Sequence, residues 1–199
     1  MAILAPTGGR AANDFARGRQ ALMLVSFLLA LASAPPLVAD GALTKEFEVK
    51  AVFLFNFTQF VEWPPTAFDD GQSPLVIGVL GDDPFGAALD AAVRGEKAHG
   101  HPLVVARYRR VEEATGCHLL YVNLSDPVEL ARVFAVLHDR CVLTVGDSEG
   151  FALHGGMVRF FSENKRIRLR INLAAAKAAK LTISSKLLRP AQVVMDEKD

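Results

Sequence analysis

The sequence predicts an α/β fold: a single domain with a mostly parallel sheet flanked by helices and a C-terminal antiparallel hairpin. Apolar runs of strand length alternate with helical segments, which is the order of a parallel sheet covered on both faces. Residues 167–171 instead alternate isoleucine or leucine with arginine, and this period of two indicates a strand with one buried face. The apolar runs are residues 75–80, 101–108, 118–122 and 142–145.

The first element of this domain is predicted to be a helix over residues 44–63. Thr44 suits the N-cap position, and Pro64 and Pro65 end the helix because proline lacks the N–H that a helix interior needs.

Aromatic residues are unusually dense in this helix. Phe53, Phe57 and Phe60 share one stripe, while Phe55 points away from it. A surface helix packed on one side would show a single apolar stripe. We therefore expect the helix to be buried on more than one side, or to meet a partner with part of its surface.

The other elements follow from caps, turns and periodicity. Asp126 is expected to cap a helix that begins at Pro127, and Asn172 is expected to cap an alanine-rich helix. The remaining predicted elements are a turn at 81–84 that leads into a short helix ending at Val93, a short helical segment at 111–115, helices at 127–138 and 173–180, hairpin strands at 157–161 and 167–171, and a short final element at 183–188.

Composition excludes several classes of protein. Lysine plus arginine and aspartate plus glutamate number 22 each, so no excess positive charge is available to hold a nucleic-acid backbone. Two cysteines are too few for a disulfide scaffold or a four-cysteine zinc site. The chain also lacks a phosphate-binding G-x-x-x-x-G-K-[ST] motif and a dinucleotide-binding G-x-G-x-x-G motif.

The first 39 residues have the order of a secretory signal peptide. Arg10, Arg17 and Arg19 precede a short apolar run at 21–32, and small residues follow up to Ala39. The run would form about 18 Å of helix, which is short for a hydrocarbon layer of about 30 Å. We expect cleavage after Ala39, an exported α/β domain at 40–194 and a polar tail at 195–199. The alternative is an uncleaved membrane anchor.

Five segments of the chain together form a recognisable pattern. They are VKAVFLFNFTQFVEWP at 49–64, LVIGVLGDDPFG at 75–86, CHLLYV at 117–122, CVLTVGD followed by F and GGMVRF within 141–160, and IRLRINLAAAKAAKLTISSKLL at 167–188. They cover nearly all of the expected mature chain, and in order and without large gaps they resemble the YfiR family of exported regulatory proteins.

The resemblance implies a function and partners. The best-known members are periplasmic proteins that bind the periplasmic part of an inner-membrane diguanylate cyclase and repress it, which lowers cyclic di-GMP and biofilm formation. An OmpA-like outer-membrane lipoprotein can sequester such an inhibitor, and members are often dimers. Related domains occur in membrane sensors joined to kinase modules. The alternative function is therefore a periplasmic domain that binds a small molecule and signals to a membrane kinase.

Cys117 and Cys141 are disulfide candidates. Each precedes a predicted parallel strand, and neighbouring strands lie about 4.8 Å apart, near the Cα separation that a disulfide accepts. A bridge would close a loop of about 25 residues and stabilise the fold by about 3 kcal/mol in the chain-entropy model. The alternative is a pair of buried free thiols.

Aspartates follow two of the predicted strands. Asp82 and Asp147 would lie at the carboxyl edge of the sheet, where open α/β sheets bind ligands, and they are the candidate ligand edge. A simpler interpretation is that the Asp82–Asp83 pair before Pro84 satisfies free amides at a turn into a helix.

Arginines on the hairpin are candidates for partner contact. Arg159, Arg166, Arg168 and Arg170 are expected to share its outer face, which could meet an acidic protein surface or simply be solvated. With the stripe of the first helix, the candidate partner-binding residues are Phe53, Phe57, Phe60, Arg159, Arg168 and Arg170.

No motif indicates catalysis. Ser184, Ser185 and Lys186 do not have the S-x-x-K spacing, and no G-x-S-x-G is present. His99, His101 and His118 lack the neighbours of a metal site. We expect a protein that binds another protein, with no catalytic residue, metal, cofactor or nucleic acid.

Overall fold

The computed structural model describes residues 39–194 of the chain. The chain divides into two units, residues 1–41 and 42–199, and the second contains the folded domain. Its helices are α2 (Ala39–Phe60), α3 (Ala87–Val93), α4 (Pro127–Leu137), α5 (Leu173–Ala178) and α6 (Ser185–Leu188), with 3-10 turns η1 (Pro65–Ala67) and η2 (Val111–Ala114). Its strands are β1 (Val61–Glu62), β2 (Leu75–Gly81), β3 (Lys97–Ala98), β4 (His101–Tyr108), β5 (Leu119–Asn123), β6 (Leu143–Gly146), β7 (Val158–Glu163), β8 (Arg166–Asn172), β9 (Thr182–Ile183) and β10 (Gln192–Val194).

Eight of the strands form one sheet in the order β10-β8-β7-β6-β5-β2-β4-β3. The five strands β7, β6, β5, β2 and β4 run parallel to one another, whereas β8 pairs antiparallel with β7 and β3 pairs antiparallel with β4. This confirms the predicted α/β fold, with its mostly parallel sheet and its C-terminal hairpin. Asn164 and Lys165 have φ values of 51° and 60°, so the two-residue turn of the hairpin matches the right-handed twist of its strands.

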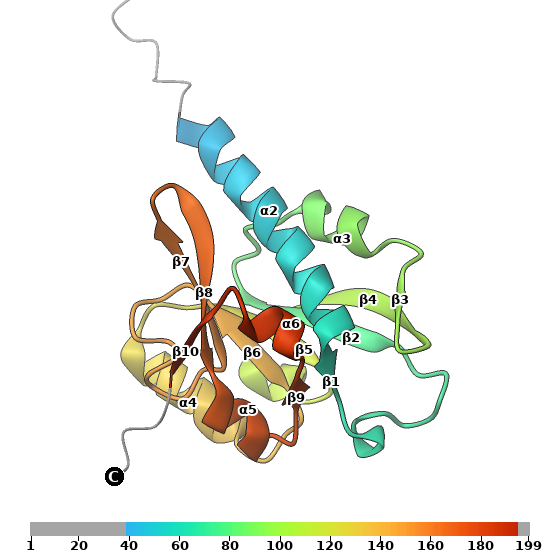
Figure 1. The fold of residues 1–199 in the computed structure, drawn as a ribbon. Coiled ribbons are helices and arrows are strands. Elements are labelled where there is room, and N and C mark those ends of the chain that lie inside the picture. The colour runs from blue at the N-terminus through green and yellow to red at the C-terminus, as the bar shows by residue number, and fades with distance from the viewer. Residues whose placement is uncertain (1–38, 195–199) are drawn as a thin grey trace, which may run out of the picture. The chain divides into compact units, whose positions relative to one another are not determined.

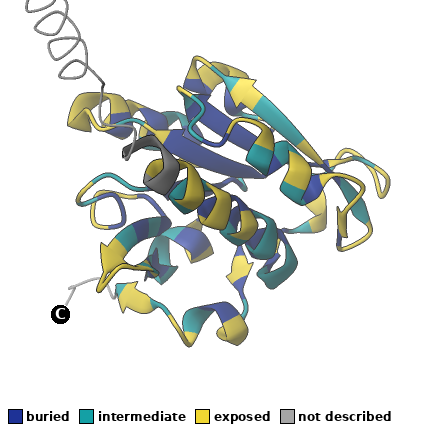
Figure 2. Cartoon of the chain, turned by 90° about the horizontal axis from the view of Figure 1, so that it is seen from above, coloured by how far each residue is buried: buried dark blue, intermediate teal, exposed yellow. Residues whose placement is uncertain are grey.

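Each face of the sheet carries its own apolar cluster. On one face, α2 lies across the strands (Figure 1), with Leu54 and Phe57 fully buried against Ile77, Tyr121 and Val145. On the other face, α4 contributes Leu130, Val133 and Leu137 to a second cluster. The central strands are therefore buried on both faces, whereas exposed residues gather on the outer helix surfaces and at the hairpin tip (Figure 2).

The first helix differs from its predicted bounds. It begins at Ala39, so Thr44 lies inside it and is not the N-cap, and it ends at Phe60. Val61 and Glu62 leave the helix because they pair antiparallel with β9 as a separate two-stranded sheet. Trp63 is buried, and its indole Nε1–H donates to the carbonyl oxygen of His118 at 3.0 Å.

Two predicted caps are confirmed. The carboxylate of Asp126 accepts from the amides of Val128 and Glu129, and the side chain of Asn172 accepts from the amide of Ala175. The sequence analysis missed β10, which pairs parallel with β8.

We predict that Leu54→Ala lowers the free energy of unfolding by about 2–5 kcal/mol, because Leu54 has no exposed surface and its loss leaves a cavity under α2. Val52→Ala on the same helix is the matched control. Val52 is 52% exposed, so we expect a change below about 0.5 kcal/mol. Urea unfolding of both variants measures the difference, and equal losses would contradict the burial assigned to α2.

Candidate functional site

A buried lysine holds α2 to the carboxyl edge of the sheet. Lys50 is 5% exposed, and its Nζ lies 2.6 Å from Oε1 of Glu46 and 2.5 Å from Oδ2 of Asp147. Glu46 is one turn earlier on α2, whereas Asp147 directly follows β6. An ammonium group removed from water must stay paired, so this arrangement fixes the helix over the end of β6.

Asp147 is therefore engaged within the protein. Besides Lys50, it lies near the hydroxyl of Tyr121, whose pKa is raised by burial and next by the negative charge of Asp147. Its carbonyl oxygen accepts from Nε of Arg159 at 3.4 Å. Asp147, which the sequence suggested as part of a ligand site, therefore anchors α2 in this structure.

The other aspartates at this edge have different roles. Asp82 is exposed, and its carbonyl accepts from Nδ2 of Asn123. The carboxylate of Asp83 accepts from the amides of Phe85 and Gly86 in the turn before α3, as the capping interpretation predicted. Arg107 also donates to Asp83, at 2.9 Å.

The arginines of the hairpin share one face. The β7–β8 register places Arg159 opposite Arg170 and Arg168 opposite Phe161. Arg166, two residues before Arg168, points to the same face of the hairpin. Arg168 is exposed and lies 3.4 Å from a carboxylate oxygen of Glu163. The guanidinium of Arg170 lies 5.3 Å from the centre of the Phe161 ring. The predicted arginine-rich outer face is present.

The aromatic stripe of α2 divides into core and partly exposed residues. Phe57 has no exposed surface and stacks on Phe160, with ring centres 5.8 Å apart, so it offers no contact area to a partner. Phe53 and Phe60 are half-buried. Val49 and Val52, which the candidate set omitted, are 44% and 52% exposed on the same helix.

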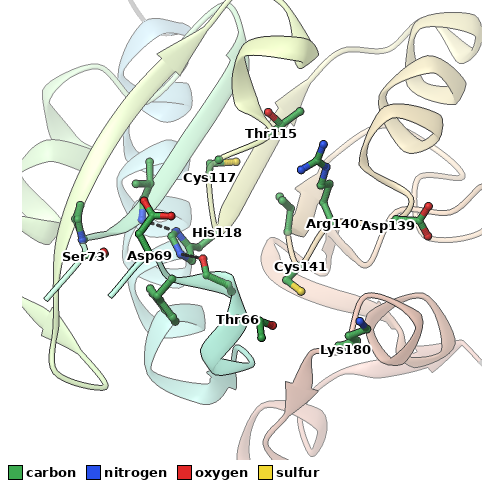
Figure 3. A pocket seen from close by; sticks show the side chains of 16 residues that line it. Thr66, Asp69, Ser73, Thr115, Cys117, His118, Asp139, Arg140, Cys141 and Lys180 are labelled. Atoms are coloured by element: carbon green, nitrogen blue, oxygen red, sulfur yellow. Dashed lines mark hydrogen bonds between the residues drawn. The ribbon is translucent and has the colours of Figure 1, made fainter. Parts of the chain in front are cut away.

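A hollow of about 510 Å³ opens at the opposite, amino-terminal edge of the sheet (Figure 3). It lies where the chain enters β2, β5 and β6, and sequence reasoning did not predict it. Its polar and sulfur-bearing side chains are Thr66, Asp69, Ser73, Thr115, Cys117, His118, Asp139, Arg140, Cys141 and Lys180.

His118 holds the wall of this hollow together. Its Nδ1 accepts from the amide of Val76 at 3.1 Å, so its Nε2 carries the proton and donates to the carbonyl of Ala67 at 3.0 Å. Its ring stacks on Phe68, which stacks in turn on His101. Burial lowers the pKa of His118, and the neighbouring His101 lowers it further.

The two cysteines lie on the same hollow and at the same level of the sheet. Leu119, the first residue of β5, pairs with Leu143, the first residue of β6, and each cysteine precedes its strand by two residues. Both are free thiols in the structure; Cys117 is buried and Cys141 is partly exposed. Burial raises the pKa of the Cys117 thiol to about 12. The bridge between them stays a prediction.

We predict that the protein loses stability on acidification through His118. A pKa lower in the folded state than in the unfolded state means that the unfolded chain takes up the proton first. The full stability is present above the ordinary pKa of about 6.5 and falls as the pH drops through the folded pKa. Urea unfolding between about pH 8 and about pH 5 measures this slope.

His118→Gln should be less stable but should show a smaller slope over that range. His138→Gln is the control, because His138 is exposed and its ring contacts the exposed carboxylate of the adjacent Asp139. An unchanged slope in His118→Gln would assign the pH dependence to another group.

We predict that the reduced protein is alkylated at Cys141 well before Cys117. Thiolate is the reactive form, and burial together with a pKa of about 12 leaves Cys117 almost entirely protonated at neutral pH. Peptide mass spectrometry after timed iodoacetamide treatment gives the order. Equal rates would show that Cys117 is accessible.

Within residues 39–194, no helix is long and apolar enough to cross a membrane. The same part of the chain holds no group of three or more histidine, cysteine, aspartate or glutamate side chains that could bind a metal ion.

The chain was compared with known proteins. A family model described as YfiR/HmsC-like matches residues 47–192. No curated protein matches. Among solved structures, a conserved domain protein from Vibrio cholerae O1 is similar, with 16% sequence identity and a TM-score of 0.43 over 61% of this chain and 55% of that one. The chain therefore spans about half the length of that protein.

Proposed function

The chain belongs to the YfiR/HmsC-like family, and from this premise we propose that it binds the periplasmic part of an inner-membrane diguanylate cyclase and represses it. The family is one of periplasmic regulators of cyclic di-GMP signalling. The observation that carries the proposal is the family match, which extends from α2 to the first residue of β10.

The surface supports a role in protein binding. The hairpin presents arginines on one face, and α2 exposes apolar side chains at Val49 and Val52. Arginine and apolar side chains together are typical of protein interfaces. From the sequence-derived set we retain Phe53, Phe60, Arg159, Arg168 and Arg170 as contact residues and leave out the fully buried Phe57.

Repression would act by linkage. A protein that binds the inactive state of a cyclase more tightly than its active state shifts the equilibrium toward the inactive state. About 1.4 kcal/mol of differential affinity is enough for tenfold repression. Sequestration by an OmpA-like lipoprotein, or a change in the Cys117–Cys141 pair, would relieve repression by weakening that binding. A homodimer is compatible with this scheme.

Export is part of the proposal. Residues 1–38 lie outside the described part of the chain, so the signal peptide and its cleavage after Ala39 rest on the sequence alone. The tail at 195–199 lies outside it as well. The proposed mature protein is a periplasmic domain that begins at Asp40.

We predict that deletion of the gene raises intracellular cyclic di-GMP in the native host, by about tenfold if the differential affinity is about 1.4 kcal/mol. Mass spectrometry of nucleotide extracts measures it. A plasmid copy with residues 1–39 should reverse the rise, and a copy that lacks residues 2–39 should not. An unchanged level on deletion would contradict the proposed repression.

A second candidate function is a small-molecule sensor that signals to a membrane kinase. The observation that favours it is the hollow at the amino-terminal edge of the sheet, which has the size of a ligand site and a mixed polar lining. A ligand that raises the melting temperature of the wild type but not of a variant with a filled hollow, such as Gly116→Trp, would support this function.

A further inference from the structure

The strand β7 has one open edge. Along its whole length it pairs with β8, from Val158 to Glu163. On its other side it pairs with β6 only at Val158 and Arg159, because the chain leaves β6 after Gly146. Residues 160–163 therefore extend beyond the body of the sheet as part of the protruding hairpin (Figure 1), and no described strand covers their outer side.

The backbone of Ser162 points to this open side. In an antiparallel pair, residues that bond the partner strand alternate with residues that turn their N–H and C=O away from it. The amide of Asn172 donates to the carbonyl of Met157, which fixes the odd-numbered residues of β7 as those that bond β8. Ser162 is exposed and belongs to the outward-facing set, and no described strand pairs with that side of it.

Two adjoining hollows border the open edge. One, of about 370 Å³, lies between the end of β6 and residues Phe160 to Ser162 of β7, and the other, of about 690 Å³, lies between α2 and the hairpin tip. They share Glu46, Ser162 and Ile167, and so form one continuous groove. The wall on the α2 side is apolar at Val49 and Phe53.

The groove carries an excess of positive charge. Its cationic side chains are Lys45, Lys50, Arg159, Lys165 and Arg166, and its carboxylates are Glu46 and Asp147. Both carboxylates are already bound to Lys50. Lys45, Lys165 and Arg166 form no ion pair among the described residues, so the field at the groove favours an anionic occupant.

We propose that an extended acidic segment of the repressed partner protein adds to the open edge of β7 in this groove. The N–H of Ser162 donates to a carbonyl of the segment, and the C=O of Ser162 accepts from one of its amides. Acidic side chains of the segment meet Lys45, Lys165 and Arg166, and an apolar side chain packs on Val49 and Phe53. Main-chain bonds supply affinity in strand addition, whereas side-chain pockets supply specificity. This inference rests on the proposed function, because it takes the cyclase as the partner.

The lysines and arginines also disfavour pairing of this edge with a second copy of the chain. An exposed strand edge is a template for association, and charged side chains on it are the usual protection. Two copies meeting at this edge would bring their cationic side chains together, whereas an acidic segment neutralises them.

The test uses Ser162→Pro and its control Ser162→Ala in the mature protein. Proline removes the outward N–H and places its ring where the added strand would lie, and edge strands tolerate it because no ladder bond to β8 is lost. Alanine keeps both backbone groups. The probes are the purified periplasmic regions of the host's membrane diguanylate cyclases, each titrated by calorimetry. We expect Ser162→Pro to weaken binding at least about tenfold and Ser162→Ala to leave it unchanged.

A charge pair and a measurement on the wild type extend the test. Lys45→Glu should weaken binding, whereas Lys177→Glu on α5, an equal change at an exposed site outside the groove, should not. In the wild-type complex, hydrogen exchange at the Ser162 amide should slow relative to the free protein. This readout holds even if Ser162→Pro fails to fold.

The outcomes separate the two proposals. If no periplasmic region binds the wild type, the proposed function is wrong and this inference falls with it. If one binds, but Ser162→Pro binds equally well and the Ser162 amide stays unprotected, strand addition is wrong while the proposed function stands. A third outcome is that the wild type dimerises through Ser162 while Ser162→Pro still binds the partner. This result would assign the edge to a second copy of the chain and overturn the inference.

Discussion

The seating of α2 on the sheet is the constraint on which the rest of the structure depends. Leu54 and Phe57 bury the helix on the central strands, and Lys50, one turn earlier, ties it to Asp147 at the end of β6. Sliding the helix along the sheet would separate the buried ammonium of Lys50 from Asp147 and leave it with Glu46 on the same helix. The helix is therefore held at a fixed position relative to the β7–β8 hairpin. This position leaves the groove between the helix and the hairpin.

The two edges of the sheet have different chemistry because of this arrangement. At the carboxyl edge, the carboxylate of Asp147 is paired with Lys50 and that of Asp83 with the turn into α3, whereas Asp82 is exposed. At the amino edge, a neutral His118 and two thiols line a hollow. Among the described residues, no ion pair spans this hollow. A partner protein in the groove and a small ligand in the hollow would therefore lie toward opposite ends of β6.

The sequence predicted those features that local pattern encodes. Continuous apolar runs indicated β2, β5 and β6, alternation indicated β8, and Asp126 and Asn172 were found as caps because their bonds reach only two or three residues. It did not predict the pairing of Lys50 with Asp147, since the two are 97 residues apart. The available sequence signal was Lys50 itself, a single lysine within the aromatic face of the helix, which needs a carboxylate partner if it is buried. The three-residue β10 is too short and too exposed to show a period.

The central claim is that this protein inhibits a cyclase across the membrane by binding its periplasmic side. The most direct test reconstitutes each full-length diguanylate cyclase of the host in nanodiscs, which leave both faces open, and measures cyclic di-GMP formation from GTP as the mature protein, beginning at Asp40, is titrated in. The account predicts that the rate for one cyclase falls saturably and that heat-unfolded protein has no effect. Unchanged rates for every cyclase at saturating protein would contradict it.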